Sequence, residues 1–201
     1  MRGFSDEERQ RIEEALVETA RDLFTRYGFQ KTTVQDITDP VGIAESTFYR
    51  FFDSKSEIYL RALIREQDEM IDVVEAELEG VVDPETQLDL LLRTWIREFE
   101  RHPLLVESHR DPQELALTLN EEELVDAKEL VAVRMFPVIE EIQASSDGWL
   151  SEVEPAMVFE LLSVLELVAT QQEAHDSIGW SGYDAFTELL LTVLKRGLLS
   201  E

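Results

Sequence analysis

The sequence predicts an all-α protein, in which a small N-terminal three-helix domain precedes a larger helical domain. Helix start and stop signals recur along almost the whole chain. No stretch alternates apolar and polar residues as a half-buried strand would, and no internal repeat is visible. Hydrophobic residues make up 44% of the 201 residues, which is enough for a sizeable core.

The first helix is expected to start at Ser5, because Ser5 and Glu8 have the spacing of a capping box. Gly28 is expected to end it. Its apolar stripe consists of Ile12, Leu16, Ala20, Leu23 and Tyr27. Thr33 with Asp36 then starts a second, short helix.

A break at Pro40 and Gly42 separates this second helix, which Pro40 shortens, from a third helix over residues 44–52. Two short helices joined by a tight turn containing glycine are typical of a helix-turn-helix unit, whose second helix enters the DNA major groove. The side chains expected to face the core are Val34, Ile37, Phe48 and Phe52. Those expected on the outside are Ser46, Thr47, Tyr49, Arg50 and Phe51. Hydroxyl and guanidinium groups of this kind bind phosphate oxygens and base edges.

The rest of the chain also reads as helical, giving about nine helices in all. Ser54 with Glu57 starts a long helix that runs to Gly80. The later helices are expected at 84–102, around 104–108, from Asp111, at 121–144 with a kink at Pro137, at 155–175, and finally up to Leu199.

The charge is strongly acidic and unevenly distributed. There are 44 acidic and 18 basic residues, a net charge of −26. Residues 1–60 hold eight basic and twelve acidic residues, so −4 lies there and −22 on residues 61–201. An acidic surface with few lysines resembles proteins of salt-loving cells, and an ordinary acidic protein is the alternative. If any part binds a polyanion, the nearly neutral N-terminal part is the one expected.

Several classes of protein are disfavoured. No run of apolar residues is long enough for a transmembrane helix, and the N-terminus is unlike a signal peptide. Cysteine is absent, so disulfides and thiolate metal sites are excluded. No spacing argues for a metal site and no cofactor motif is present. A cytoplasmic protein that is not an enzyme is expected.

Residues 11–60 resemble the DNA-binding domain of the TetR family of transcriptional regulators. The matching elements are Tyr-Gly-Phe after the first helix, then Thr-Thr-Val, Val-Gly-Ile, Thr-Phe-Tyr, and Phe followed by Ser-Lys-Ser-Glu. The resemblance implies a DNA-binding domain at 1–54 and an effector-binding and dimerisation domain at 55–201. It also implies a ligand-responsive repressor that binds a palindromic operator in double-stranded DNA as a dimer.

The resemblance assigns roles to individual positions. Phosphate contacts are implied for Thr33, Thr47, Tyr49 and Lys55. Base reading is implied for Ala44, Glu45, Ser46 and Arg50. Where the family often has Ser, Lys and Gly, this chain has Ala44, Glu45 and Ser46, and Glu45 would repel phosphate or accept a hydrogen bond from cytosine.

Two further expectations concern the larger domain. The segments "AMVFELLSVLELVAT" and "FTELLLTVLKRGLL" are apolar on nearly every side, so a partner subunit is expected to cover the last two helices; an internal helix pair is the alternative. A small, largely apolar effector is expected. The candidate ligand-binding residues are Trp95, Phe99, His102, Met135, Phe136 and Phe159, each of which could instead be core.

Two other functions compete with regulation of transcription. An acidic protein-interaction module could keep the fold without binding DNA, which Glu45 and the net charge favour. A helical enzyme with buried carboxylates is the third class, although no carboxylate pair stands out.

Overall fold

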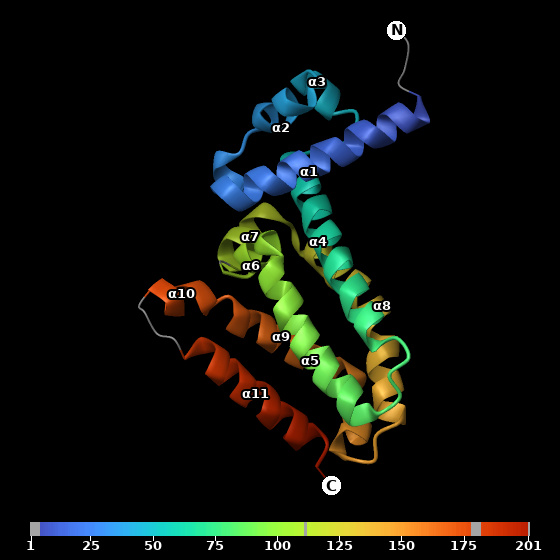
Figure 1. The fold of residues 1–201 in the computed structure, drawn as a ribbon. Helices are drawn as coiled ribbons and strands as arrows, with labels where there is room; N and C mark the ends of the chain where they lie inside the picture. Colours follow the sequence, from blue (N-terminus) through green and yellow to red (C-terminus); the bar gives the residue numbers. More distant parts are fainter. Residues whose placement is uncertain (1–4, 111, 178–181, 201) are drawn as a thin grey trace.

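The computed structural model describes residues 5–110, 112–177 and 182–200. Within these ranges it contains helices and no strand, which confirms the all-α fold class (Figure 1). The N-terminal unit comprises α1 (Asp6–Lys31), α2 (Val34–Val41) and α3 (Glu45–Phe48). The remainder comprises α4 (Lys55–Leu78), α5 (Pro84–Arg101), α6 (Pro103–Arg110), α7 (Pro112–Thr118), α8 (Glu121–Ala144), the 3-10 helix η1 (Trp149–Glu152), α9 (Pro155–Ala169), α10 (Gln172–Ser177) and α11 (Tyr183–Leu198).

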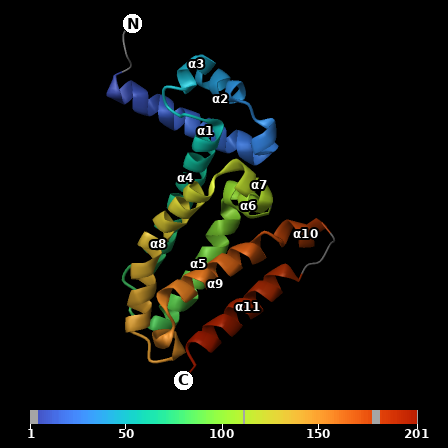
Figure 2. The same cartoon turned by 180° about the vertical axis from the view of Figure 1, so that it is seen from behind.

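The N-terminal unit sits at one end of an elongated molecule, and the C-terminus lies at the other (Figure 1). Helix α4 runs from α1 into the larger helical part, where it packs against α5 and α8. Seen from behind, α8 lies over α4 and α9 lies over α5, with α11 beside α9 (Figure 2). Helix α4 therefore contacts both ends of the molecule and joins them along the chain.

The core of the N-terminal unit follows the predicted pattern. Phe48 and Phe52 are buried, with ring centroids 5.5 Å apart, and Val34 and Ile37 are buried with them. The predicted stripe of α1 is wrong at its last member, because Tyr27 is 57% exposed. Phe24 fills the core there instead, at 1% exposure.

Two boundaries in the N-terminal unit differ from the prediction. Gly28 has φ 78° and breaks α1, but one further helical turn follows to Lys31. Helix α2 is not shortened by Pro40, since it continues to Val41. A proline this close to the helix end removes a single backbone hydrogen bond. The end is capped by Gly42, which has φ 76° and donates to the carbonyl oxygens of Thr38 and Asp39.

The predicted helix at 44–52 is also wrong in length, because α3 covers only Glu45–Phe48. The N–H groups of Arg50 and Phe51 bond to the carbonyl oxygens three residues earlier, which winds the chain more tightly than an α-helix. Phe52 still bonds to the carbonyl of Phe48, so the two rings keep their common direction.

Farther along, the predicted helix 155–175 is split. Helix α9 ends at Ala169, a tight turn in which the N–H of Gln171 bonds to the carbonyl of Val168 follows, and α10 starts at Gln172. Pro137 lies inside α8. The predicted start at Asp111 lies outside the described residues. In the described part of the chain, no helix is both long and apolar enough to cross a bilayer.

Candidate functional site

The helix-turn-helix surface is held in place by local hydrogen bonds. Thr33 and Asp36 form a complete capping box at the start of α2, since each side chain accepts the other's backbone N–H. The hydroxyl of Thr33 also donates to Asp36 at 2.6 Å. These bonds hold the pKa of Asp36 below its usual value. The turn that follows is closed by Gly42, so the start of α3 is placed by backbone contacts.

Most of the residues for which DNA contact is expected are exposed. Thr33, Ala44, Glu45, Ser46, Tyr49 and Arg50 are exposed, and Thr47 and Lys55 are partly buried. Tyr49 is 53% exposed and packs edge-on against Phe48, with ring centroids 5.3 Å apart. Its hydroxyl therefore projects from a ring that the core holds in position.

Lys55 has a structural partner that the sequence did not indicate. Its Nζ donates to the backbone carbonyl oxygens of Phe29 (2.8 Å) and Thr32 (2.9 Å). It also lies 4.1 Å from the centroid of the Phe29 ring. Burial lowers the pKa of Lys55. The first residue of α4 thus holds the end of α1, and at most one of its N–H groups remains for a phosphate.

Arg9 is a cation of this surface that the sequence reasoning missed. One of its guanidinium nitrogens donates to the backbone carbonyl of Arg50 (3.3 Å), and the group lies 5.3 Å from the centroid of the Phe51 ring. Arg9 and Arg50 are 41 residues apart in the sequence, so no local pattern could have paired them.

A second candidate site is a cavity in the larger part, with a volume of about 240 Å³. Helices α4, α6, α7, α8 and α9 enclose it. Its apolar lining consists of Leu60, Leu63, Leu105, Leu115, Leu119, Leu124, Ala127, Val131 and Phe159. Its polar lining consists of Gln67, Ser108, His109, Lys128, Ser163 and Glu166.

An ion pair forms part of the cavity wall. Nε2 of His109 lies 3.3 Å from Glu166, and its Nδ1 lies 2.9 Å from the carbonyl oxygen of Leu105. Both partners are acceptors, so the doubly protonated imidazolium satisfies both. Burial opposes the charge, but the hydrogen bond and charge of Glu166 outweigh it, and the pKa of His109 is raised. The other oxygen of Glu166 accepts from Nε1 of Trp95 at 3.1 Å.

The six candidate ligand residues are distributed differently from that expectation. Of the six, only Phe159 lines this cavity. The ring of Phe136 packs edge-on against the ring of Phe159. Trp95 and Phe99 lie one layer behind, in contact with Glu166 and His109. Met135 is fully buried in the core, and His102 bonds through Nδ1 to the carbonyl oxygen of Glu98.

His109 and Glu166 are residues of the cavity that the sequence reasoning did not select. Glu166 carried a signal, because it is a carboxylate in the middle of an apolar helix segment. In the part of the chain that the structure describes, no group of three His, Cys, Asp or Glu side chains could hold a metal ion.

A buried carboxylate links the cavity wall to α4. Glu66 is 2% exposed, and one of its oxygens accepts the N–H groups of both Leu104 and Leu105 at 3.1 Å. It thereby caps the first turn of α6, the helix that carries His109. Burial raises the pKa of Glu66, although the bonds from α6 oppose this. Helix α6 also packs against α1, so it contacts both ends of the molecule.

Comparison with known proteins shows which proteins this chain resembles. Residues 16–62 match the model of the bacterial regulatory proteins of the tetR family. The chain is 28% identical over 89 residues to the uncharacterized HTH-type transcriptional regulator YvdT of Bacillus subtilis (strain 168). That match covers 44% of this chain and 46% of YvdT, so it spans just under half of the relative's length.

Solved structures share the fold over nearly the whole chain. A TetR transcription regulator from Haloarcula marismortui superimposes with a TM-score of 0.70 at 16% identity, covering 95% of this chain and 100% of that one. FadR from Bacillus subtilis in complex with stearoyl-CoA gives 0.67 at 15% identity, covering 92% and 98%. Residues 16–62 thus resemble the N-terminal part of the tetR-family regulators, and the chain as a whole shares its fold with solved TetR regulators.

Proposed function

We propose that this protein is a ligand-responsive repressor of transcription that binds a palindromic operator as a homodimer. One observation carries the proposal. A family-type helix-turn-helix presents exposed Ser46, Tyr49 and Arg50 on a unit whose rings, Phe48 and Phe52, are locked in the core. Two such units in a dimer would read two half-sites related by the two-fold axis.

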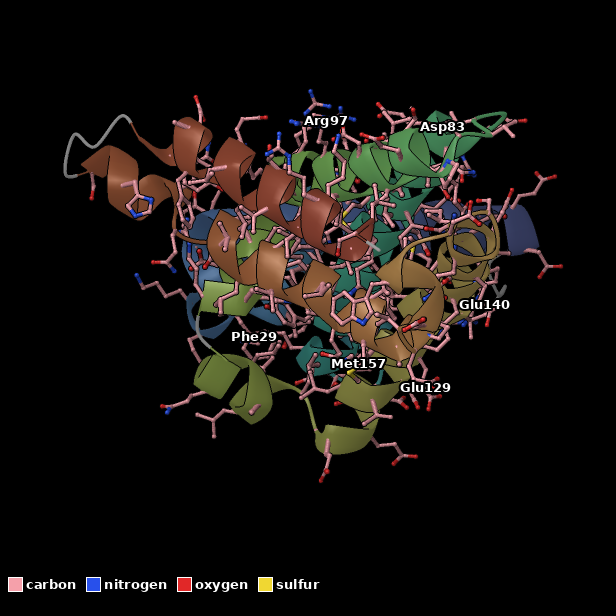
Figure 3. All side chains as sticks on the ribbon, turned by 90° about the horizontal axis from the view of Figure 1, so that it is seen from below. Phe29, Asp83, Arg97, Glu129, Glu140 and Met157 are labelled. Carbon is pink, nitrogen blue, oxygen red and sulfur yellow. The ribbon has the colours of Figure 1, made fainter. Side chains whose placement is uncertain are left out.

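Residues of α9 and α11 would form the dimer interface. These helices lie side by side in all three views (Figures 1–3). In Figure 3, the label Met157 marks a residue of α9. Their exposed apolar side chains are Met157, Val164 and Leu167 on α9 and Phe186, Leu189 and Val193 on α11. Two adjacent helices that expose so many large apolar groups favour a partner subunit as the cover.

Variants on this face test the dimer. Leu167→Glu and Leu189→Glu should each convert the dimer to a monomer in sedimentation at molar salt. Val133→Glu is the matched control, because Val133 is 73% exposed but lies on α8. A dimer that persists in both interface variants, or dissociates only in Val133→Glu, would move the interface elsewhere.

Selection of bound sequences from random DNA, at molar salt, tests the function itself. An enriched palindrome is expected. Arg50→Ala should relax the preference at one position of each half-site by about 1–3 kcal/mol, whereas Tyr49→Ala should weaken binding to all sequences alike.

The acidic protein-interaction module remains the second candidate. Glu45 is exposed in the first turn of α3, where it would face the DNA backbone. Absence of any enriched sequence, with a folded dimer, would favour that function. Enrichment that depends on Arg50 would instead favour the repressor, in which Glu45 could accept a hydrogen bond from the amino group of a cytosine.

Release of DNA would depend on the cavity between α4 and α9. An effector shifts DNA affinity only if it binds one arrangement of the two domains better than the other. The contacts of Glu66 with α6, and the direct continuation of α4 into the N-terminal unit, support α6 and α4 as the route. The neighbouring FadR structure holds stearoyl-CoA, which supports an effector with an apolar part.

A further inference from the structure

The charged groups of the cavity are already paired within the protein. Glu166 bonds to His109 through one oxygen and to Trp95 through the other. The second nitrogen of His109 is taken by the carbonyl of Leu105. At the rim, Nζ of Lys128 lies 2.6 Å from Glu160. A charged ligand group inside the rim would therefore have to displace an existing partner or be buried without one, and both cost free energy.

Two polar side chains of the lining have no such partner among the described residues: the amide of Gln67 on α4 and the hydroxyl of Ser163 on α9. Each is uncharged and can both donate and accept a hydrogen bond. Nine of the other thirteen lining residues are aliphatic or aromatic. Inside the rim, where Lys128 lies, the unmet hydrogen-bonding capacity of the cavity is thus that of neutral groups.

We propose that this cavity binds an uncharged, largely apolar molecule, whose single hydrogen-bonding group, an alcohol, ketone or amide, is held by Gln67 and Ser163. The volume of about 240 Å³ equals the share of about eight water molecules at ~30 Å³ each, which suits a short aliphatic chain or one substituted ring. The inference rests on the proposed function only where it concerns the release of DNA.

A series of ligands with one chain length and different head groups tests the charge preference. The probes are 1-octanol, 2-octanone, octanoate and octylammonium, at pH 7.5 so that the last two are ionised. Calorimetric titration of the full-length protein gives each dissociation constant, and the melting temperature gives an independent readout. The alcohol and the ketone should bind about tenfold or more tightly than either ion.

Substitutions locate the head group. Gln67→Leu and Ser163→Ala should each weaken 1-octanol binding by about three- to tenfold, the loss of about one hydrogen bond. Gln171→Leu is the matched control, because Gln171 is exposed and lies outside the cavity. Val131→Phe should fill the cavity and weaken all four probes, and its circular dichroism checks that the variant is folded.

Tighter binding of octanoate or octylammonium would overturn the neutral-ligand assignment, as would failure of all four probes to bind. Binding that is unaffected in Gln67→Leu and Ser163→Ala would overturn the assigned head-group contacts. A separate operator titration distinguishes the proposed function. If 1-octanol binds as expected and operator affinity is unchanged, the cavity assignment stands and the ligand-responsive part of the proposed function fails.

Discussion

The side-chain nitrogen of Lys55 lies 2.8 Å from the backbone carbonyl oxygen of Phe29, and this contact joins the first residue of α4 to the last turn of α1. The carbonyl of Thr32 is held by the same ammonium group. A charged donor at a helix C-terminus stabilises the unpaired carbonyls there. Because α4 also packs against helices of the larger part, this contact connects the end of α1 to the helix that joins the two parts.

Lys55→Met should therefore destabilise the protein as well as weaken DNA binding. The methionine keeps an apolar stem over Phe29 but leaves two carbonyl oxygens without their donor, which should cost about 1–2 kcal/mol for this partly exposed group. The measurements are thermal unfolding and operator titration at a temperature where both proteins are folded. Weakened DNA binding with an unchanged melting temperature would show that Lys55 acts only on phosphate.

Two substitutions of Glu66 should show whether its side chain acts as a hydrogen-bond acceptor or through its charge. Glu66→Gln keeps an oxygen for Leu104 and Leu105 and removes a buried charge, so stability at neutral pH should be equal or higher. Glu66→Leu leaves both N–H groups unpaired and should cost about 2–4 kcal/mol. Comparable losses in both variants would show that the charge itself is required.

The pH dependence of the same group follows from its raised pKa. Above its unfolded pKa of about 4.3, and up to the folded pKa, the folded protein binds the proton more strongly than the unfolded chain does. The stabilisation is thus fully present below that window and is lost as the pH rises through it. In Glu66→Gln, the melting temperature should no longer fall as the pH rises through this window. A fall that is unchanged in Glu66→Gln would contradict the assignment.

Deprotonation of His109 should produce a second fall of the melting temperature, at higher pH. Since Glu166 raises the pKa of His109 above its unfolded value of about 6.5, the stabilisation is present below pH ~6.5 and is lost as the pH rises through the folded pKa. The melting temperature should fall over that window in the parent protein. It should fall less in His109→Gln and in Glu166→Gln, because each removes one partner. If the fall of the melting temperature over this pH window is the same in both variants as in the parent protein, another group is responsible for it.

Salt should stabilise this protein rather than weaken it. Acidic side chains cover the surface, and Asp83, Glu129 and Glu140, labelled in Figure 3, lie on its periphery. With a net charge of −26, like charges repel across the molecule at ~0.01 M salt, where the Debye length is about 30 Å, and only between neighbours at ~1 M, where it is about 3 Å.

Thermal unfolding and operator titrations across a potassium chloride series check this expectation. The melting temperature should rise with salt, and operator affinity should depend on salt weakly or increase, since few basic residues are available for counterion release. A melting temperature that stays flat while DNA affinity falls steeply would show that the acidity is not an adaptation to salt.

The sequence by itself determined the helical class, most helix starts and the inward direction of Phe48 and Phe52. These features depend on residues a few positions apart: Thr33 and Asp36 form their capping box within one turn, and two rings at i and i+4 must share a face. The family motif is equally local, because it lies within residues 11–60.

Only the tertiary structure decided the cavity and the contacts between the two ends of the molecule. His109 and Glu166 come from different helices, as do Glu66 and Leu105, and their pairing depends on how α4, α6 and α9 pack. Trp95 and Met135 look like ligand residues in the sequence but are used to fill the core. The period of a helix shows which side chains share a face, whereas helix packing decides whether that face meets core, cavity or solvent.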